Sequence, residues 1–328
     1  MKALVIGATG IIGNHVVRAL LAEGIEVRAF SRGVKQALNL EGVDVERFKG
    51  DLNDAASLKE GAKGCQWIFH TAGYYPTHSF GFADHVRKGT SEIKRVLESV
   101  EHPSLERFVF TSSLTTIGRP QYFGELADEN CRYDLPKSPH PYFAVKIVME
   151  EEVRRAARRG YPAVIVNPTG CFGPYELKPI HLCLVPQLIR GKIPAFVEGK
   201  LNAVDVADVG RGHVLAAKKG RVGERYILGG HDIFISDLLR TICRLGDCTP
   251  PRIKVPLKLA MAGAWISEFL SHYVFNSGSL LSVLGLKFVE HGQHFTLEKA
   301  RKELGYTVSP LEPCITRAID WYRRIGYC

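Results

Sequence analysis

The sequence predicts an α/β fold built on a doubly wound parallel sheet, and two observations lead to that prediction. A short apolar run, residues 3–6, continues through the glycine-rich segment Gly7–Gly13 into an amphipathic helical pattern. Short apolar runs and helical patterns then alternate through the first half of the chain. Strands separated by helices of this length join through right-handed crossovers, which produce a parallel sheet with helices on both faces.

The expected elements follow in order along the chain. Strands are expected at 3–6, 27–30, 43–48, 67–70, 107–111 and 163–167, with helices at 11–23, 55–61, 82–99 and 142–158. In the second half, helices are expected at 182–190, 206–217, 236–245, 257–273, 296–304 and 310–325, with a strand at 225–228. Ser236 is expected to cap its helix. We expect residues 1–170 to form a dinucleotide-binding Rossmann domain, to which part of 203–230 returns, and residues 171–328 to form mainly a smaller, interleaved substrate-binding domain.

The composition is that of an ordinary soluble protein, since 45% of the 328 residues are hydrophobic and 23% are charged. The sequence shows no secretory segment and no apolar run long enough to span a membrane, so a cytoplasmic location is expected. The formal net charge of +9 suits an anionic cofactor or substrate, and it equally serves solubility alone. Basic residues between 154 and 159 fit a solvated helix face, and no nucleic-acid-binding signature accompanies them.

The cysteines are scattered along the chain. The eight cysteines lie at 65, 131, 171, 183, 243, 248, 314 and 328 without the spacing of a metal site. We therefore expect reduced thiols, mostly in the core, and no bound metal.

Residues 257–286 form the most apolar part of the second half and are expected to be core or a pocket wall. A dimer face and a membrane-surface contact are the alternatives.

The glycine-rich segment has the spacing of a diphosphate-binding turn. Gly7 permits a tight turn, Gly10 lets the backbone approach a diphosphate, and Gly13 lets the following helix pack against the strand. The N-terminus of that helix would face the anion. An ordinary strand–turn–helix corner is the alternative.

A second motif supplies the candidate chemistry. Tyr142 and Lys146 lie at i and i+4, on one face of an expected helix, where an ammonium favours the phenolate of the tyrosine. Ser113 follows the strand at 107–111, and ligands bind at the carboxyl ends of the strands of a parallel sheet. The Ser113 hydroxyl could therefore hold the reacting oxygen.

Further segments join these motifs and identify the chain as a member of the extended short-chain dehydrogenases/reductases over its whole length. These segments are Gly50-Asp51-Leu52, Phe69-His70-Thr71-Ala72, Phe110-Thr111-Ser112-Ser113 and Asn167-Pro168-Thr169. Within that superfamily the chain most resembles dihydroflavonol-reductase-like proteins and the hopanoid-associated sugar epimerase group. Residues 173–179, 223–230 and 320–323 carry this closer likeness.

The resemblance implies a role for each residue of the site. Tyr142 would be the acid/base, Lys146 would bind the nicotinamide ribose and lower the Tyr142 pKa, and Ser113 would orient the carbonyl or hydroxyl. Ser113 is preferred to Ser112 because it stands five residues before Gly118, as in the family's pattern. The implied cofactor-binding residues are Gly7, Thr9, Gly10, Ile11, Ile12, Gly13, Asp51, Leu52, Thr71, Ala72, Gly73, Tyr142, Lys146, Pro168 and Thr169.

The chain departs from the family's pattern at two places. Where the family usually reads Asn-Val-x-Gly-Thr, this chain has Val86-Arg87-Lys88-Gly89-Thr90, so a proton relay through that asparagine is in doubt. The segment at 201–208 lacks the arginine that nucleotide-sugar members usually carry. A nucleotide-sugar substrate would therefore lose one of its anchors.

The end of the second expected strand indicates which cofactor is used. An NAD site usually has an acidic residue there, whereas this chain has Ser31 and Arg32, followed by Lys35. A guanidinium can bind a phosphate through two parallel hydrogen bonds. We therefore expect NADP(H) to be preferred, with Arg32 as the main discriminator and Lys35 as a minor one. If Arg32 is only solvated or stacks on adenine, NAD(H) would serve as well.

Aromatic and apolar residues after the strand ends are candidates for the substrate pocket, although some of them could be core. They are Tyr74, Tyr75, Phe80, Thr115, Cys171, Phe172, His181 and Phe196. The function expected is an NADPH-dependent reductase of a hydrophobic ketone or aldehyde. An NAD(P)-dependent sugar epimerase or dehydratase and a non-catalytic dinucleotide sensor are the alternatives. A homodimer through the helices at 82–99 and 144–158 is an open possibility.

Overall fold

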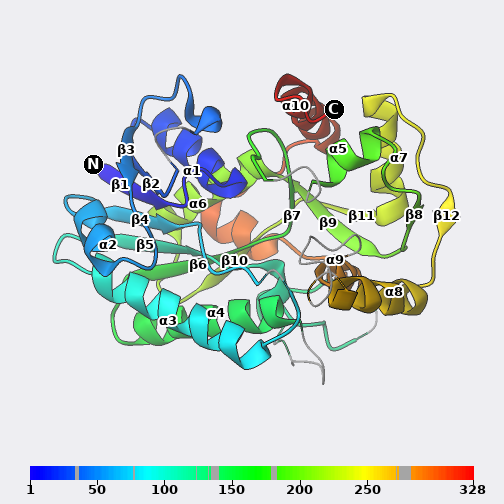
Figure 1. Ribbon diagram of the computed structural model, residues 1–328. Coiled ribbons are helices and arrows are strands. Elements are labelled where there is room, and N and C mark those ends of the chain that lie inside the picture. The colour runs from blue at the N-terminus through cyan, green and yellow to red at the C-terminus, as the bar shows by residue number, and fades with distance from the viewer. Residues whose placement is uncertain are drawn as a thin grey trace.

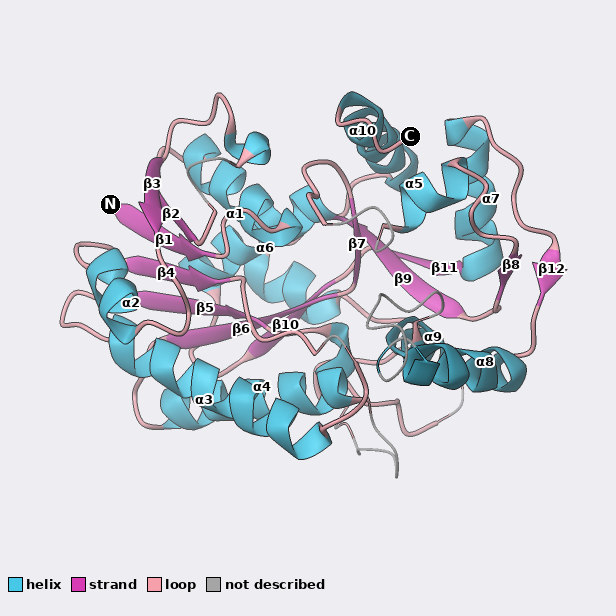
Figure 2. Ribbon diagram, viewed as in Figure 1, coloured by secondary structure: helices cyan, strands magenta, loops and turns pink. Residues whose placement is uncertain are grey.

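The main body of the fold is a seven-stranded, wholly parallel sheet in the order β10-β6-β5-β4-β1-β2-β3 (Figures 1 and 2). The computed structural model describes residues 1–33, 37–76, 78–122, 124–131, 133, 140–178, 183–270, 272 and 282–328. The strands of this sheet are β1 (Lys2–Ile6), β2 (Glu26–Ser31), β3 (Glu46–Lys49), β4 (Trp67–His70), β5 (Arg107–Thr111), β6 (Ala163–Pro168) and β10 (Arg225–Leu228). The predicted doubly wound α/β fold is therefore confirmed.

Helices cover both faces of this sheet (Figure 2). On one face lie α1 (Ile11–Ala22) and α6 (Val206–Lys219), and on the other lie α2 (Ala55–Ala62), α3 (Phe82–Val100) and α4 (Pro141–Arg158). The side chains of β1 show why two layers are needed. Ala3 and Val5 pack into the core on one face, while Leu4 and Ile6 pack into the core on the other. Every apolar side chain of such a strand is buried, as in other parallel sheets.

The second half of the chain adds two small sheets beside the carboxyl edge of the large one. One has the order β11-β9-β7 and the other pairs β12 with β8. Their strands are β7 (Gly170–Phe172), β8 (Ala195–Phe196), β9 (Lys200–Asp205), β11 (His231–Phe234) and β12 (Ile253–Lys254). The helices of this half are α5 (Leu184–Ile189), α7 (Ile235–Gly246), α8 (Leu257–Leu270), α9 (Val283–His291) and α10 (Leu311–Arg324).

Three local predictions were wrong. The strand predicted at 43–48 occupies Glu46–Lys49 instead. Ser236 is not the N-cap of its helix, because α7 begins at Ile235 directly after β11, and the Ser236 N–H donates to the Glu198 carboxylate at 3.2 Å. The helix predicted at 296–304 ends in a π-helical turn, Ala300–Leu304. The strands β7, β8, β9, β11 and β12 and the helix α9 were not predicted, since each is too short to show a clear period in the sequence.

The apolar stretch at 257–286 divides between two environments. α9 buries Val283, Leu284 and Leu286. α8 buries only Ala260, Ala264 and Glu268, and it exposes large apolar side chains, among them Leu259 at 67% and Ile266 at 62%. The prediction of core or pocket wall is therefore wrong for the outer face of α8.

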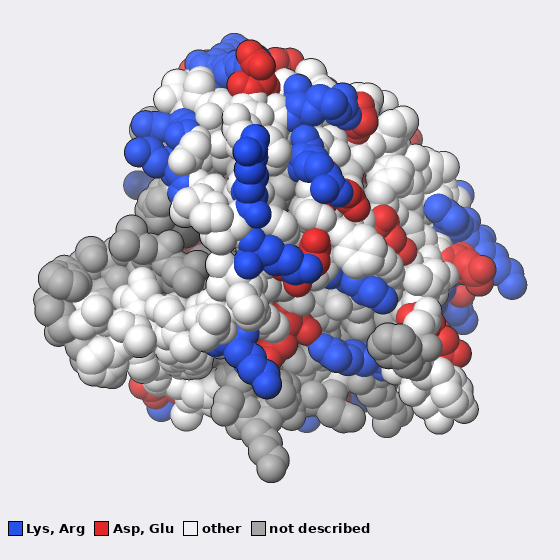
Figure 3. Space-filling view, turned by 90° about the vertical axis from the view of Figure 1, so that its right-hand side faces the viewer, with Lys and Arg blue, Asp and Glu red and all other residues white. Residues whose placement is uncertain are grey.

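Basic and acidic side chains are mixed on the surface of the protein. On the face shown in Figure 3, basic side chains are interspersed with acidic ones and form no continuous basic surface. Within the part of the chain that the structure describes, every helix is too short or too polar to cross a membrane. All eight cysteines are free thiols, and Cys65, Cys183, Cys243 and Cys314 are buried.

Candidate active site

The glycine-rich turn is built as its spacing predicts. The Gly7 N–H donates to the Phe30 carbonyl at 2.9 Å, and the Gly10 N–H donates to the Gly7 carbonyl at 2.9 Å. Gly7 has a φ of +90°, and a Cβ there would lie 2.8 Å from the Ala72 backbone nitrogen. A Cβ at Gly13 would lie 2.2 Å from the Gly7 carbonyl oxygen. Only glycine fits at both positions, so Gly7 and Gly13 are needed for the turn itself.

Gly10 differs from these two glycines because space remains in front of it. Among the described residues, a Cβ at Gly10 would meet only the Gly7 carbonyl oxygen, at 3.3 Å. Gly10 is exposed and precedes α1, whose first residues, Ile11 and Ile12, are half-buried. The first N–H groups of a helix have no acceptor within the helix, so this end attracts an anion. These residues therefore fit the diphosphate of a dinucleotide.

The segments that the resemblance assigns to the rest of such a cofactor follow the ends of β2 and β3. The Thr9 hydroxyl donates to the Ser31 hydroxyl at 3.2 Å, and the exposed Arg32 follows at the end of β2. The Asp51 carboxylate accepts from the Asn53 N–H at 2.9 Å, and Leu52 packs against the core between the sheet and α2–α4. Lys35 lies outside the described residues.

Ser113, Tyr142 and Lys146 converge at the carboxyl edge of the sheet. Tyr142 and Lys146 lie on α4, which starts with Pro141 and is capped by His140, whose Nδ1 accepts from the Tyr142 N–H at 3.1 Å. All three residues of the set are buried. The Lys146 ammonium donates to the Thr111 carbonyl, at the end of β5, at 3.3 Å.

The electrostatics of this set follow mainly from burial. Burial raises the pKa of Tyr142 above its ordinary value, the neighbouring Tyr75 raises it further, and a hydrogen bond with Ser113 lowers it. Burial lowers the pKa of Lys146 to about 8. The low Tyr142 pKa that the resemblance implies stays a prediction for the protein with its cofactor bound.

Ser112 and Ser113 face different partners. The Ser113 hydroxyl accepts from the Thr115 N–H at 3.2 Å and reaches Tyr142, whereas the Ser112 hydroxyl donates to the Glu150 carboxylate at 2.5 Å. The structure therefore places Ser113, and not Ser112, beside the phenol, and the catalytic role that the resemblance implies for Ser113 stays a prediction.

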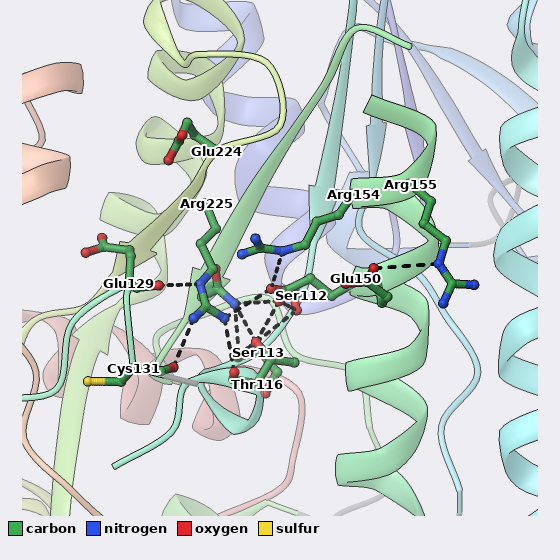
Figure 4. Close-up of polar contacts among 12 residues, drawn as sticks. Ser112, Ser113, Thr116, Glu129, Cys131, Glu150, Arg154, Arg155, Glu224 and Arg225 are labelled. Atoms are coloured by element: carbon green, nitrogen blue, oxygen red, sulfur yellow. Dashed lines mark hydrogen bonds and ion pairs between the residues drawn. The ribbon is translucent and has the colours of Figure 1, made fainter. Parts of the chain in front are cut away.

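A buried polar network lies directly behind Ser113 (Figure 4). The Glu150 carboxylate accepts from the Thr116 hydroxyl at 2.6 Å, from the Asn167 amide at 3.0 Å and from Arg225 at 3.1 Å. The Asn167 amide also donates to the Ser113 carbonyl at 3.1 Å. These bonds fix the backbone that carries Ser113.

This network was not predicted from the sequence, although part of it had a signal. Glu150 stands four residues after Lys146, so Tyr142, Lys146 and Glu150 repeat at one-turn spacing along a single helix face. Arg225 gave no signal, since an arginine at the start of an expected strand is ordinarily exposed.

On the substrate side, the side chains around Tyr142 come from three parts of the chain, the segments that hold Tyr75, Cys171 and Phe288. The Tyr75 ring centroid lies 4.9 Å from that of Tyr142, and the Phe288 ring, from α9, lies 5.7 Å from it. Cys171 is near enough to raise the pKa of Tyr142. Thr115, which donates to Ser113, is buried in the same region. Phe288 was not predicted, because α9 itself was not.

Other predicted pocket residues have different surroundings. Phe172 and Phe196 pack against the apolar core formed by α5, α7 and α10. The Tyr74 hydroxyl lies 2.7 Å from His85 Nδ1, and the Phe80 ring contacts Trp265 on α8. His181 lies outside the described residues.

The remaining candidates for cofactor binding lie at the ends of β4 and β6. Thr71 donates its hydroxyl to the Ile6 carbonyl at 2.9 Å, and Ala72 closes over Gly7. Pro168 ends β6, and the Thr169 hydroxyl donates to the Asn202 side chain at 2.7 Å. This hydrogen bond of Thr169 therefore links the end of β6, in the large sheet, to β9.

Asn202 lies in the segment 201–208, where the nucleotide-sugar members of the family usually carry an arginine. Its side chain accepts from the Gly230 N–H at 2.8 Å and donates to the Asp232 carboxylate at 2.7 Å. Asn202 is buried, so it joins β9 to β11 rather than reaching a ligand. None of these contacts involves a cationic side chain that could take the place of the missing arginine.

Comparison with known proteins agrees with this geometry. Residues 3–229 match the NAD dependent epimerase/dehydratase family. A protein of Synechocystis sp. named "Putative dihydroflavonol 4-reductase" is 32% identical over 328 residues, which cover 98% of this chain and 95% of that protein. Sterol demethylase protein B of Methylococcus capsulatus is 29% identical and covers 99% of both chains.

A solved structure shows the same fold over the whole length. It is a nucleoside-diphosphate-sugar epimerase from Pseudomonas aeruginosa, 27% identical, with a TM-score of 0.82 and coverage of 100% of this chain and 99% of that one. The glycine-rich turn, the Tyr142 and Lys146 pair and these likenesses agree with one another. The chain belongs to the NAD dependent epimerase/dehydratase family, among the extended short-chain dehydrogenases/reductases, and is an NAD(P)-dependent oxidoreductase.

Proposed function

We propose that this protein is an NADPH-dependent reductase of a hydrophobic ketone or aldehyde. The observation that carries the proposal is the convergence of Ser113, Tyr142 and Lys146 at the sheet edge that also holds the open turn at Gly10. A reduced nicotinamide cofactor supplies the hydride for the carbonyl carbon. Ser113 orients the carbonyl oxygen, Tyr142 gives that oxygen a proton, and the Lys146 ammonium stabilises the tyrosinate that remains.

The surroundings of Tyr142 support a hydrophobic substrate. Tyr75, Phe288 and Cys171 present rings and a thiol to it. The buried Asn202 side chain is already bonded to Thr169, Gly230 and Asp232. Two relatives have names that refer to a dihydroflavonol and to a sterol, which are ring-bearing compounds. A sugar diphosphate would need cationic anchors on this side. Among the described residues, Lys178 is a cation that acts on Tyr75 and Cys171, and it is already paired with Glu176 at 3.0 Å, which supports the reductase over the epimerase.

The preference for NADPH rests on the end of β2. Arg32 is exposed there and follows Ser31, so its guanidinium is free to meet a ribose 2′-phosphate. No carboxylate stands at 31–33 to repel that phosphate. NAD(H) remains the alternative cofactor.

The experiment that tests the function measures cofactor stoichiometry. The purified protein is incubated with NADPH and a panel of lipophilic cyclic ketones, aldehydes and nucleotide sugars, and oxidised cofactor and alcohol are quantified together. One NADPH consumed for each alcohol formed supports the reductase. Sugar interconversion without net consumption would establish the epimerase, and cofactor binding without turnover of any compound would favour a sensor.

The arrangement of the strands supports the proposed division of the chain. Six of the seven strands of the large sheet lie before residue 170, and β10, at Arg225–Leu228, returns to it from the second half. We accordingly assign residues 1–170 to the cofactor and 171–328 mainly to the substrate. We also propose a cytoplasmic location and a homodimer through the helices α3 and α4.

A further inference from the structure

Glu92 is a buried carboxylate beside the active site that none of the roles above uses. It lies on α3 and is 8% exposed. Its Oε1 atom accepts a hydrogen bond from the Tyr74 N–H at 2.6 Å. Tyr74 follows Gly73 in the segment after β4, which is one of the segments assigned to the cofactor. The carboxylate is therefore fixed against the backbone of the site.

Gly73 shows how close this carboxylate comes to Lys146. A Cβ built at Gly73 would lie 3.8 Å from Glu92 Oε1 and 3.9 Å from Lys146 Nζ. The Glu92 carboxylate on α3 and the Lys146 ammonium on α4 thus both lie close to the Cβ position of Gly73, where glycine leaves no side chain between them. Gly89, one turn before Glu92, keeps the two helices close, because a Cβ there would lie 2.8 Å from Val145.

A second carboxylate near Lys146 is already neutralised. Glu150 lies one turn further along α4, but it forms ion pairs with Arg225 at 3.1 Å and with Arg154 at 3.2 Å. Ser112, Thr116 and Asn167 also donate to it. Glu92 differs, because the cation that acts on it most strongly is Lys146, followed by Arg95. Lys146 is therefore the main counter-charge of Glu92.

We propose that Glu92 is a positioning residue for the reaction, which holds the Gly73–Tyr74 backbone and keeps the Lys146 ammonium charged across Gly73. This inference rests on the proposed function for its consequence in turnover, but the interaction itself is a property of the folded protein. A charged Lys146 is what the reduction requires, since a neutral amine would not stabilise the tyrosinate of Tyr142.

The groups around Lys146 fix the direction of the expected effect. Burial lowers the pKa of Lys146 to about 8, and Glu92 is the largest influence that raises it, ahead of Glu150 on the same helix. His70, on β4, faces Lys146 as well, and burial and that ammonium together lower the pKa of His70. Burial raises the pKa of Glu92 above its ordinary value, whereas the hydrogen bond from the Tyr74 N–H and the charges of Lys146 and Arg95 lower it, and the charge of Asp51 raises it. Removal of the Glu92 charge should therefore make Lys146 lose its proton at a lower pH.

The test compares Glu92→Gln with the wild type by lysine-selective NMR, with the Lys146 signal assigned from Lys146→Met. The glutamine keeps an acceptor for the Tyr74 N–H and removes only the charge. We expect the Lys146 titration to move down by about one pH unit, and the alkaline limb of kcat/KM to move with it. Glu98→Gln, at an exposed position on α3, is the matched control and should move neither.

A purely structural role for Glu92 would give a different result. Glu92→Gln would then titrate and turn over like the wild type, and that outcome would overturn the proposal. Glu92→Asp retains the charge on a shorter side chain, so it should give an intermediate shift, and it keeps the proposal testable if the glutamine variant folds poorly. A shifted Lys146 titration without reduction of any ketone would uphold the interaction and refute the proposed function.

Discussion

Arg32 is the residue on which the choice of cofactor depends. It follows β2 at the point where an NAD-binding site usually places a carboxylate, and its side chain is exposed. The Ser31 hydroxyl beside it is already in contact with Thr9 at 3.2 Å. The guanidinium is therefore the group at this corner with the charge and geometry to bind a phosphate.

We expect Arg32→Ala to weaken NADPH binding about ten- to a hundredfold and to leave NADH binding within about threefold, because a charge-assisted hydrogen-bonded pair is worth roughly 1.5–3 kcal/mol. Calorimetric titration of both proteins with both cofactors measures this. Arg47→Ala, a second arginine near the same edge of the sheet, is the control and should leave the preference unchanged. Equal affinity of the wild type for the two cofactors would refute the assignment.

At the scale of the element, α4 carries much of the site, and a loop and a strand hold it in place. Arg225, at the start of β10, donates to Glu150 on α4 and to the carbonyls of Thr116, Glu129 and Cys131. One buried guanidinium thus joins β10, α4 and the segment that follows Ser113 (Figure 4). Removal of one partner from such a pair leaves an uncompensated buried charge.

Arg225→Met should therefore lower the free energy of unfolding by about 3–5 kcal/mol. Denaturant unfolding measures this, and the slope of the transition should stay unchanged if only stability is lost. Arg154→Met is the matched control. Arg154 pairs with the same Glu150, but its side chain is 31% exposed, so we expect a loss below about 1 kcal/mol. If the two variants lost the same free energy of unfolding, burial of the Arg225–Glu150 pair would not be the cause of the loss.

At the scale of the whole molecule, buried histidines make stability depend on pH. Burial lowers the pKa of six of them in the folded protein: to about 3 for His70, to about 4 for His15, His140, His213 and His291, and below its ordinary value for His85. Their ordinary value is about 6.5. The unfolded chain therefore binds protons between pH 6.5 and 4 that the folded protein does not bind, so this part of the stability is complete above pH 6.5 and is lost as the pH falls toward 4.

We expect the denaturation midpoint to fall steeply between pH 6.5 and 4, with each histidine contributing up to roughly 1.4 kcal/mol per pH unit. His213→Gln should make this fall shallower, since His213 is fully buried between Thr111 and the Val209 carbonyl. His231→Gln, at an exposed position, should leave it unchanged. A midpoint that is flat over this range would contradict the account.

The sequence predicted the large sheet well because each of its strands is a short apolar run between helices. The strands at 67–70, 107–111 and 225–228 have the bounds predicted for them. Ser113 was preferred to Ser112 because the family resemblance places the catalytic serine five residues before Gly118. The surroundings of Phe172 and Phe196 could not be predicted, since they depend on contacts with α5, α7 and α10, which lie far away in the sequence. The outward face of α8 was missed for a related reason: its apolar residues give no sign of which side packs.

The central claim is that Tyr142 gives the proton in a cofactor-dependent reduction. Its most direct test is the single-turnover rate of Tyr142→Phe with saturating NADPH and a ketone reduced by the wild type, measured together with NADPH affinity. Loss of the general acid should lower the rate by about two to four orders of magnitude. NADPH affinity should change by less than about threefold, because the phenylalanine keeps the ring in place beside Tyr75. A variant that folds, binds NADPH and retains more than about a tenth of the wild-type rate would contradict the account.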